Sequence, residues 1–260
     1  MIDLQKISGL PIALDERNNE LKFDGDFPFI KKSERSLEEL KPYLRNPNTS
    51  EGSDPVYKVW RHAYLSQDSG KIKAANLRYD LTLIPPGKID GEFSKTAGHF
   101  HLSKVGTNLP YPEIYEVLFG RAYFLTQSPG KDYNNIKGVR LIEAGPGEKV
   151  LVTPEFSGHT TINVFDEPLL MANWISDSAV YDYESYKATH GASYYFLADN
   201  DMVDIIKNPN YESMAELEKI RTKEWPQFGL LKNQPLYTLV NNLDKLRVLN
   251  YPEEFAALEW

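Results

Sequence analysis

Apolar and polar residues alternate along much of the middle of the chain, as expected for β-strands that bury one face. The alternation is clearest over residues 77–83, where leucines and a tyrosine are separated by Arg78, Asp80 and Thr82, and a Pro-Pro-Gly turn follows. Short strands divided by turns rich in glycine and proline predict an antiparallel all-β sandwich or barrel. Further strands are expected over residues 99–102, 113–127, 141–143, 150–154, 159–165 and 169–175.

The first part of the chain mixes strand-like pieces and turns with one helix signal. Ser36 and Glu39 have the spacing of a capping box, which predicts a short helix over residues 37–46. The polar, turn-forming run at 46–54 follows and predicts a boundary before the main barrel. The segment before this boundary is expected to pack on the barrel as an extension.

The pattern of apolar positions changes again after about residue 198. Residues 213–216 have capping-box spacing, which predicts a helix that also carries Leu217 and Ile220. A second helical pattern follows at 236–246, and Pro252 opens a last short helix. We expect these helices to pack against the barrel or against a partner subunit. The predicted divisions are an N-terminal extension at 1–55, the barrel at 56–198 and a C-terminal helical extension at 199–260.

Composition narrows the classes of function. The 260 residues carry a net charge of −8 without a basic tract, which argues against nonspecific binding of nucleic acid. The sequence has no cysteine, so disulfides, thiolate metal sites and cysteine nucleophiles are excluded. No run of about 18 apolar residues predicts a membrane span, and the first residues do not have the pattern of a secretion signal. A cytoplasmic protein without a membrane partner is the expectation.

Two of the five histidines stand two residues apart, at His99 and His101. Residues i and i+2 of a strand point to the same face, so both imidazoles can aim at one point. Glu113 follows at the head of an apolar run, in which alternate residues as far as Phe119 are expected to share its face. Together with His159, at the start of a third strand, these side chains are the makings of a divalent metal site.

The alternative for each histidine is an ordinary structural role. A lone histidine is more often structural than a ligand. The His99–His101 pair beside an inward-facing carboxylate favours a ligand role, because a buried carboxylate is costly unless it is paired or bound to a metal. His62 and His190 lack partners at ligand spacing. Catalytic zinc usually takes three protein ligands, so iron(II), manganese or nickel fits a site of three imidazoles and one carboxylate at least as well.

Small hydrogen-bond donors cluster near the histidines in the sequence. Thr82 lies on the preceding strand, Thr96 and Gly98 come just before His99, and Lys88 and Lys95 are close by. Hydroxyl and backbone N–H groups that point into one pocket can hold a phosphate. The alternative is that these are ordinary turn residues.

Three segments carry a resemblance to a known family. They are LRYDLTLIPPGKIDGEFSKTAGHFH, PEIYEVLFGRAYFLTQ and GHTTINVFDEPLL. Together they resemble the cupin-type glucose-6-phosphate isomerases of archaea and some bacteria, over about residues 75–197. The resemblance implies a cupin barrel, a homodimer, a sugar-phosphate substrate and one divalent ion per subunit. Iron(II) is the expected ion, and manganese, nickel or zinc are alternatives.

Site residues follow from the same resemblance. The implied metal ligands are His99, His101, Glu113 and His159, and the implied substrate contacts are Thr82, Thr96, Gly98 and Tyr115. The spacing from His101 to Glu113 is longer by about five residues than in the compact members. Those members also have a tyrosine and a histidine at the places of Ile175 and Tyr181, so Tyr181 is expected to serve part of the substrate site.

The implied reaction interconverts glucose 6-phosphate and fructose 6-phosphate. Glu113 is the expected catalytic residue and moves a proton between C1 and C2 through an enediol. The alternative is a hydride shift in which Glu113 serves mainly as a ligand. Two other classes of function remain open at this stage, a cupin metal-dependent dioxygenase and a noncatalytic sugar-phosphate-binding cupin.

Overall fold

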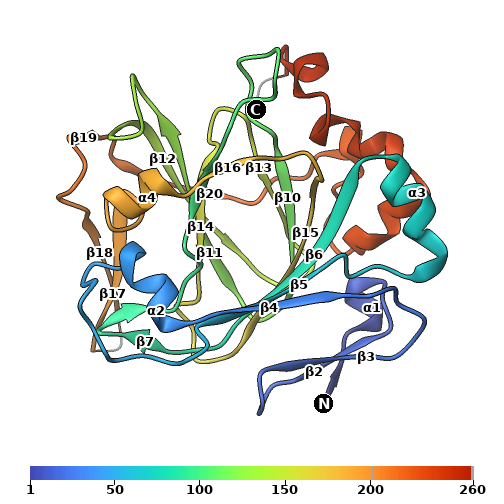
Figure 1. Cartoon of the computed structure of the whole chain (residues 1–260), viewed down its shortest axis with the longest axis horizontal. Helices are drawn as coiled ribbons and strands as arrows, with labels where there is room; N and C mark the ends of the chain where they lie inside the picture. Colours follow the sequence, from blue (N-terminus) through green and yellow to red (C-terminus); the bar gives the residue numbers. More distant parts are fainter. Residues whose placement is uncertain (201, 259–260) are drawn as a thin grey trace.

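The computed structural model describes residues 1–200 and 202–258 and is built mainly of β-strands around one barrel (Figure 1). The first wall is an antiparallel sheet of six strands. In spatial order these are β13 (Lys149–Val152), β10 (Glu113–Phe119), β15 (Leu169–Ser176), β6 (Leu77–Ile84), β5 (Tyr57–Arg61) and β4 (Lys31–Arg35). The expected all-β barrel is confirmed.

The second wall is a sheet that faces the first one across the barrel (Figure 1). Its strands are β16 (Tyr181–Asp182), β9 (His99–His101), β14 (Gly158–Ile162), β11 (Ala122–Pro129), β12 (Asn135–Ala144) and β19 (Ser213–Met214), with β20 (Leu217–Arg221) also paired to β12. Apolar side chains from both walls, among them Val117, Phe124 and Ile162, fill the deeper part of the barrel and form an interior core.

Smaller elements surround the barrel. One small sheet holds β1 (Ile2–Asp3), β2 (Ile12–Asp15) and β3 (Glu20–Phe23), and another holds β18 (Met202–Lys207), β17 (Tyr194–Asp199), β8 (Glu92–Phe93) and β7 (Lys88–Ile89). The α-helices are α1 (Gln5–Ser8), α2 (Leu37–Leu40), α3 (Ser69–Ala74) and α4 (Glu184–Ala188). The 3-10 helices are η1 (Lys41–Tyr43), η2 (Ser66–Asp68), η3 (Pro226–Phe228), η4 (Leu236–Asn241), η5 (Leu243–Leu249) and η6 (Pro252–Phe255).

The alternation of apolar and polar residues in β6 determines which side chains point out of the barrel and which point into it. Its apolar residues Leu77, Tyr79, Leu81 and Leu83 point out of the barrel into a second, outer core. Its polar residues therefore point inward, because successive side chains of a strand face opposite sides. The inner face of this wall is thus a polar surface at the open end of the barrel.

The C-terminal residues cover the outer face of the first wall (red in Figure 1). Their apolar side chains join those of β6, β10 and β15 in the outer core. Leu236 is tied at both backbone groups: its N–H donates to Glu116 Oε2 at 2.7 Å, and its carbonyl accepts from Trp174 Nε1 at 3.0 Å. The expected packing of this segment against the barrel is confirmed, as 3-10 helices in η4, η5 and η6.

The helix expected from residue 213 is wrong, because this segment forms strands β19 and β20. Both strands pair in parallel with β12, which would otherwise be the edge of its sheet. The backbone hydrogen bonds offered by an open edge outweigh a local helix signal, since propensity is a weak preference that tertiary contacts override. In contrast, the capping box of Ser36 and Glu39 is present, and its helix covers 37–40 and continues as η1.

The predicted divisions at 55/56 and 198/199 stay predictions, and strand pairing crosses both. β4 lies before the first division and pairs with β5, and β17 pairs with β18 across the second.

Phe119 departs from the face shared by Glu113 and Val117, because the register of β10 against β15 shifts between Val117 and Phe119. Its ring packs against the outer core instead. Among the described residues no helix is long and apolar enough to span a membrane.

Candidate metal centre

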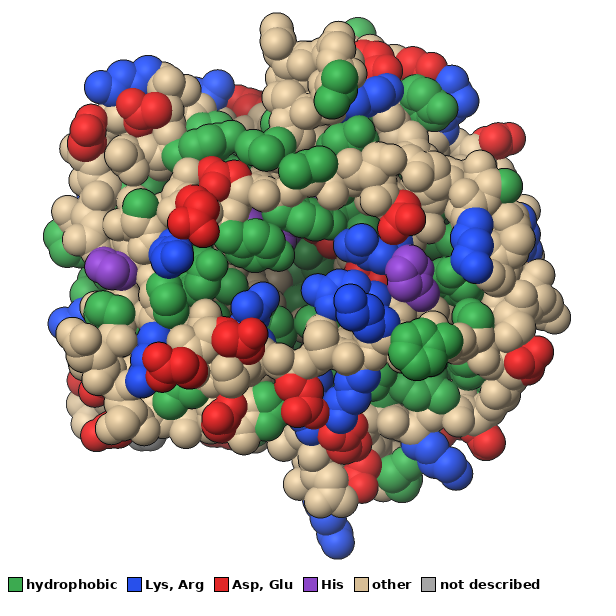
Figure 2. All heavy atoms as spheres, in the orientation of Figure 1, with side chains coloured by type: hydrophobic (Ala, Val, Ile, Leu, Met, Phe, Trp, Pro, Cys, Tyr) green, Lys and Arg blue, Asp and Glu red, His purple; other side chains and the backbone are tan. Residues whose placement is uncertain are grey.

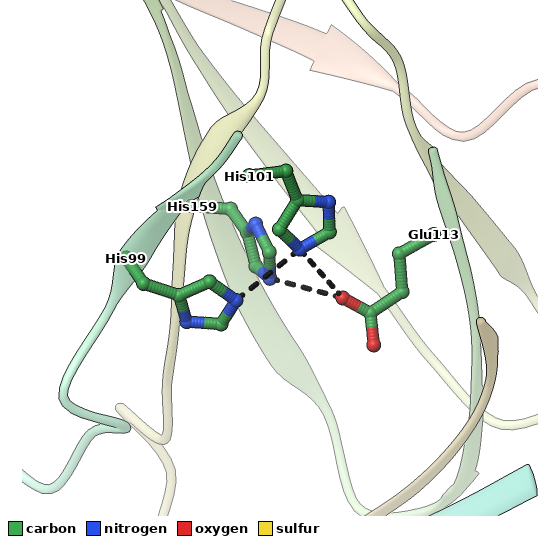
Figure 3. A group of neighbouring side chains, drawn as sticks. All are labelled: His99, His101, Glu113 and His159. Carbon is green, nitrogen blue, oxygen red and sulfur yellow. Dashed lines mark hydrogen bonds and ion pairs between the residues drawn. The ribbon is translucent and has the colours of Figure 1, made fainter. Parts of the chain in front are cut away.

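Four side chains converge inside the open end of the barrel (Figure 3). One ligand atom from each of His99, His101, Glu113 and His159 lies within 4.8 Å of every other. His101 Nε2 is 3.2 Å from His99 Nε2 and 3.3 Å from Glu113 Oε2, and His159 Nε2 is 3.4 Å from the same carboxylate oxygen. The structure therefore brings together all four residues that the sequence nominated.

Strand register explains the convergence. β9 and β14 are antiparallel neighbours in which His99 pairs with His159, so both side chains leave the second wall at the same level. His101 lies two residues further along β9 on the same face. Glu113 begins β10 in the first wall and reaches the histidines from across the barrel.

The surroundings keep His99, His159 and Glu113 in the protonation states that bind metals. Burial lowers the pKa of His99 well below its usual range, and burial also lowers the pKa of His159. Burial alone would raise the pKa of Glu113, but its close contacts with His101 and His159 bring the pKa well below its ordinary value. Neutral imidazoles and an ionised carboxylate are the forms that coordinate divalent ions.

The donor set fits one divalent ion. At metal–ligand distances of about 2.1 Å, neighbouring ligand atoms lie roughly 3 Å apart and opposite ones roughly 4 Å apart. The spacings of 3.2, 3.3 and 3.4 Å are of this size. His101 Nδ1 is 2.6 Å from the carbonyl oxygen of Tyr111 and donates to it, so Nε2 carries the free lone pair toward the centre.

A cavity of about 470 Å³ opens from this centre toward solvent. Figure 2 shows a hollow near the middle of the molecule, with lysine or arginine side chains and hydrophobic or tyrosine side chains around it. The predicted substrate contacts Thr82, Thr96, Gly98, Tyr115 and Tyr181 all line the cavity.

Two of these residues also build the local structure. The Thr96 hydroxyl accepts a hydrogen bond of 3.0 Å from the N–H of Thr161, which fixes the loop before β9 to β14. Gly98 has φ = 74°, and a Cβ at this position would lie 2.5 Å from the ring of Tyr186. The chain can therefore enter β9 in this way only with glycine, which lets the backbone turn directly into His99.

Several lining residues were missed by sequence reasoning. They are the cations Lys31, Arg35, Arg61 and Arg78, together with Asn173, which donates to Glu113 Oε1 at 2.7 Å. Arg78 was within reach of the sequence, because it shares a face of β6 with Thr82. The expected lysines lie elsewhere: Lys95 is buried in an ion pair with Glu92, and Lys88 lies over the ring of Phe93.

The remaining histidines lie outside the four-residue group. His62 donates its backbone N–H to Asp80 Oδ1 at 3.1 Å, and His190 Nδ1 is 3.2 Å from the carbonyl oxygen of Pro42. Neither belongs to a group of potential metal ligands among residues 1–200 and 202–258.

Comparison with known proteins gives a consistent result. Residues 34–213 match the model of the glucose-6-phosphate isomerase family. The glucose-6-phosphate isomerase of Pyrococcus abyssi is 30% identical over 194 residues, which are 73% of this chain and 93% of that protein. The enzyme of the same name from Thermococcus litoralis is 30% identical over 186 residues, 70% of this chain and 88% of that protein. Among solved structures, oxalate decarboxylase from Bacillus subtilis superposes with a TM-score of 0.34 at 19% identity, over 52% of this chain and 29% of that one.

Proposed function

The chain belongs to the glucose-6-phosphate isomerase family, and on that premise we propose that it interconverts glucose 6-phosphate and fructose 6-phosphate at the metal centre. The observation that carries this proposal is the His99, His101, Glu113 and His159 group at the base of a cavity large enough for a sugar phosphate. Iron(II) is the proposed ion, since three imidazoles and one carboxylate suit a first-row divalent metal. A homodimer in the cytoplasm is the proposed working form.

The proposed reaction moves a hydrogen between C1 and C2 and a proton between their oxygens. A bound divalent ion would act as a Lewis acid on these oxygens. The protein residues would hold the ion and orient the sugar. The Tyr115 hydroxyl oxygen lies 3.0 Å from His159 Nε2, and Tyr115 pairs with Asn173 of the neighbouring strand, so both lie at the same level of the cavity.

Glu113 has partners at both of its oxygens. Oε1 accepts from Asn173, and Oε2 faces the histidines. This arrangement supports a role for Glu113 as a ligand over its role as the base that carries a proton between carbons, because a metal-bound carboxylate is a weak base. We therefore propose a hydride shift. Isomerisation in D2O should give product without solvent deuterium at C1 or C2, as measured by mass spectrometry; deuterium at either carbon would return Glu113 to the role of base.

The other two classes of function are not favoured. A dioxygenase would use the same four ligands, and oxygen uptake by the iron(II)-loaded protein would reveal it. A noncatalytic sugar-phosphate-binding cupin would bind fructose 6-phosphate without turnover. Membership of the isomerase family over most of the barrel supports isomerisation over both.

The phosphate is proposed to bind at the end of the cavity near Thr82, Thr96 and Gly98. Arg61 supplies positive charge to the same cavity from β5, where it pairs with Asp80, two residues from Thr82, and it donates to Ser33 Oγ at 2.7 Å. Arg61→Gln keeps a donor but removes the charge, so the KM for fructose 6-phosphate and the inhibition constant for inorganic phosphate should both rise about tenfold. Lys187→Gln, at an exposed ion pair on α4, is the control and should change neither constant. An unchanged phosphate constant in Arg61→Gln would move the phosphate elsewhere.

The proposed function is tested by metal removal and reloading. Protein stripped with a chelator should lose turnover of fructose 6-phosphate and regain it with iron(II), and to different extents with manganese, nickel or zinc. The coupled appearance of glucose 6-phosphate measures the rate, and elemental analysis measures the metal per chain. A folded protein that binds one ion per chain yet turns over nothing would contradict the isomerase assignment.

A further inference from the structure

Arg78 is held rigidly on the inner face of β6. Its Nε donates to Asp80 Oδ2 at 2.7 Å, and one terminal nitrogen donates to the hydroxyl oxygen of Tyr181 at 3.0 Å. Asp80 is 4% exposed, and its other oxygen accepts the backbone N–H of His62. A guanidinium bonded on two sides of its planar fork has one orientation, so the Tyr181 hydroxyl is held in place as well.

The hydrogen bond from Arg78 also sets the direction of the Tyr181 hydroxyl. Because the phenolic oxygen accepts from Arg78, its own hydrogen points away from the guanidinium. No group among the described residues accepts that hydrogen, and Tyr181 lines the cavity. Its ring centre is 4.7 Å from that of His99 and 5.3 Å from that of His101. A hydrogen-bond donor is thus available beside the metal ligands.

The charge environment and the position of Arg78 both argue against a role in binding the phosphate. The carboxylate of Asp80 neutralises it, and Asp177 lies 3.6 Å from a terminal nitrogen. Arg78 is also level with Glu113, since both pair with Ile175 of β15. Thr82, in the proposed phosphate end, lies four residues further along β6, about 13 Å away. Arg78 therefore belongs to the end of the cavity where the reacting carbons would bind.

We propose that Tyr181 donates a hydrogen bond to a sugar oxygen next to the reacting carbons, and that Arg78 and Asp80 are positioning residues that fix this donor. The inference rests on the proposed function for the identity of the sugar. It explains how this chain works with Tyr181 and Ile175 at the places where compact members of the family have a histidine and a tyrosine. The site would select ligands with a hydrogen-bond acceptor at this end of the sugar.

A double-mutant cycle tests the coupling of Arg78 and Tyr181 in the metal-loaded protein. Tyr181→Phe and Arg78→Lys should each weaken fructose 6-phosphate binding about tenfold by calorimetry and lower kcat/KM by about tenfold or more. Inorganic phosphate should bind all variants within about twofold of the wild type. The double variant should be no weaker than Tyr181→Phe within about twofold, because Arg78 acts through the hydroxyl that Tyr181→Phe removes.

Three results would overturn the inference: multiplicative losses in the double variant, full sugar affinity in Tyr181→Phe, or phosphate affinity lost together with sugar affinity. If Arg78→Lys does not fold, Asp80→Asn replaces it in the same cycle, because it keeps the size of the side chain and removes the charge that fixes Arg78. Turnover of the wild type is a separate readout. A wild type that binds the sugar phosphate without turnover would contradict the proposed function, while the binding cycle would still decide the inference.

Discussion

Replacing Glu113 with glutamine should leave the protein folded and lower isomerisation by at least about 10²-fold, since loss even of an outer-shell partner of a metal ligand costs about 10- to 100-fold. Glu113 is the one carboxylate of the four-residue group. Glutamine has the same shape, so the hydrogen bond from Asn173 and the packing at the base of the cavity can persist. The missing charge leaves three imidazoles to hold the ion. Turnover and metal content per chain, measured after reloading with each ion, check this result.

The matched control is Glu34→Gln. Glu34 also lines the cavity, but its carboxylate points to the surface and pairs with Lys32 at 2.9 Å. This variant should keep full activity and one ion per chain, because exposed ion pairs contribute little. Glu113→Gln with wild-type turnover and wild-type metal content would remove Glu113 from the site.

The metal centre could be predicted because its signals are local. The i, i+2 spacing of His99 and His101 fixes a shared face as soon as the segment is a strand. Glu113 stands out for a similar reason, since a carboxylate at the head of an apolar run needs a partner inside the barrel. Neither inference depends on knowing which strands become neighbours, and the structure brings these residues together with His159.

The cations of the cavity could not be predicted in the same way. Arg35 and Arg61 reach it because β4 and β5 extend the first wall from β6 outward. That order of strands follows from long-range pairing, which leaves no signal in a short window of sequence. The contact of Arg78 with Tyr181 likewise joins residues about a hundred positions apart.

The error at residues 213–221 has a related cause. The capping-box spacing and the apolar positions Met214, Leu217 and Ile220 describe a helix only if the segment is considered alone. β12 offers an open edge, and all the residues of β20, Leu217–Arg221, pair with it. The backbone hydrogen bonds to β12 give the strand an advantage that local propensity does not include.

Removing residues 223–260 should prevent cooperative folding. This segment contributes apolar side chains that are almost fully buried in the outer core, at Leu230, Leu236, Val240, Leu246, Val248 and Leu249. At about 1.5–3 kcal/mol for each buried side chain, the loss is on the order of 10 kcal/mol. That is comparable to the whole stability of a typical domain, about 5–15 kcal/mol. Circular dichroism and chemical denaturation of the shortened chain measure the effect.

The loss should be one of stability and not of the metal ligands, because the segment covers the side of the first wall opposite to the cavity. Two single substitutions test the same contribution to stability on a smaller scale. Leu246→Ala opens a space in the outer core and should cost about 2–5 kcal/mol. Glu254→Ala removes only an exposed ion pair with Arg247 and should cost less than about 1 kcal/mol. A shortened chain that still unfolds cooperatively, within a few degrees of the full chain, would show that the barrel is stable without its outer core, and the Leu246→Ala cost would then have to be small as well.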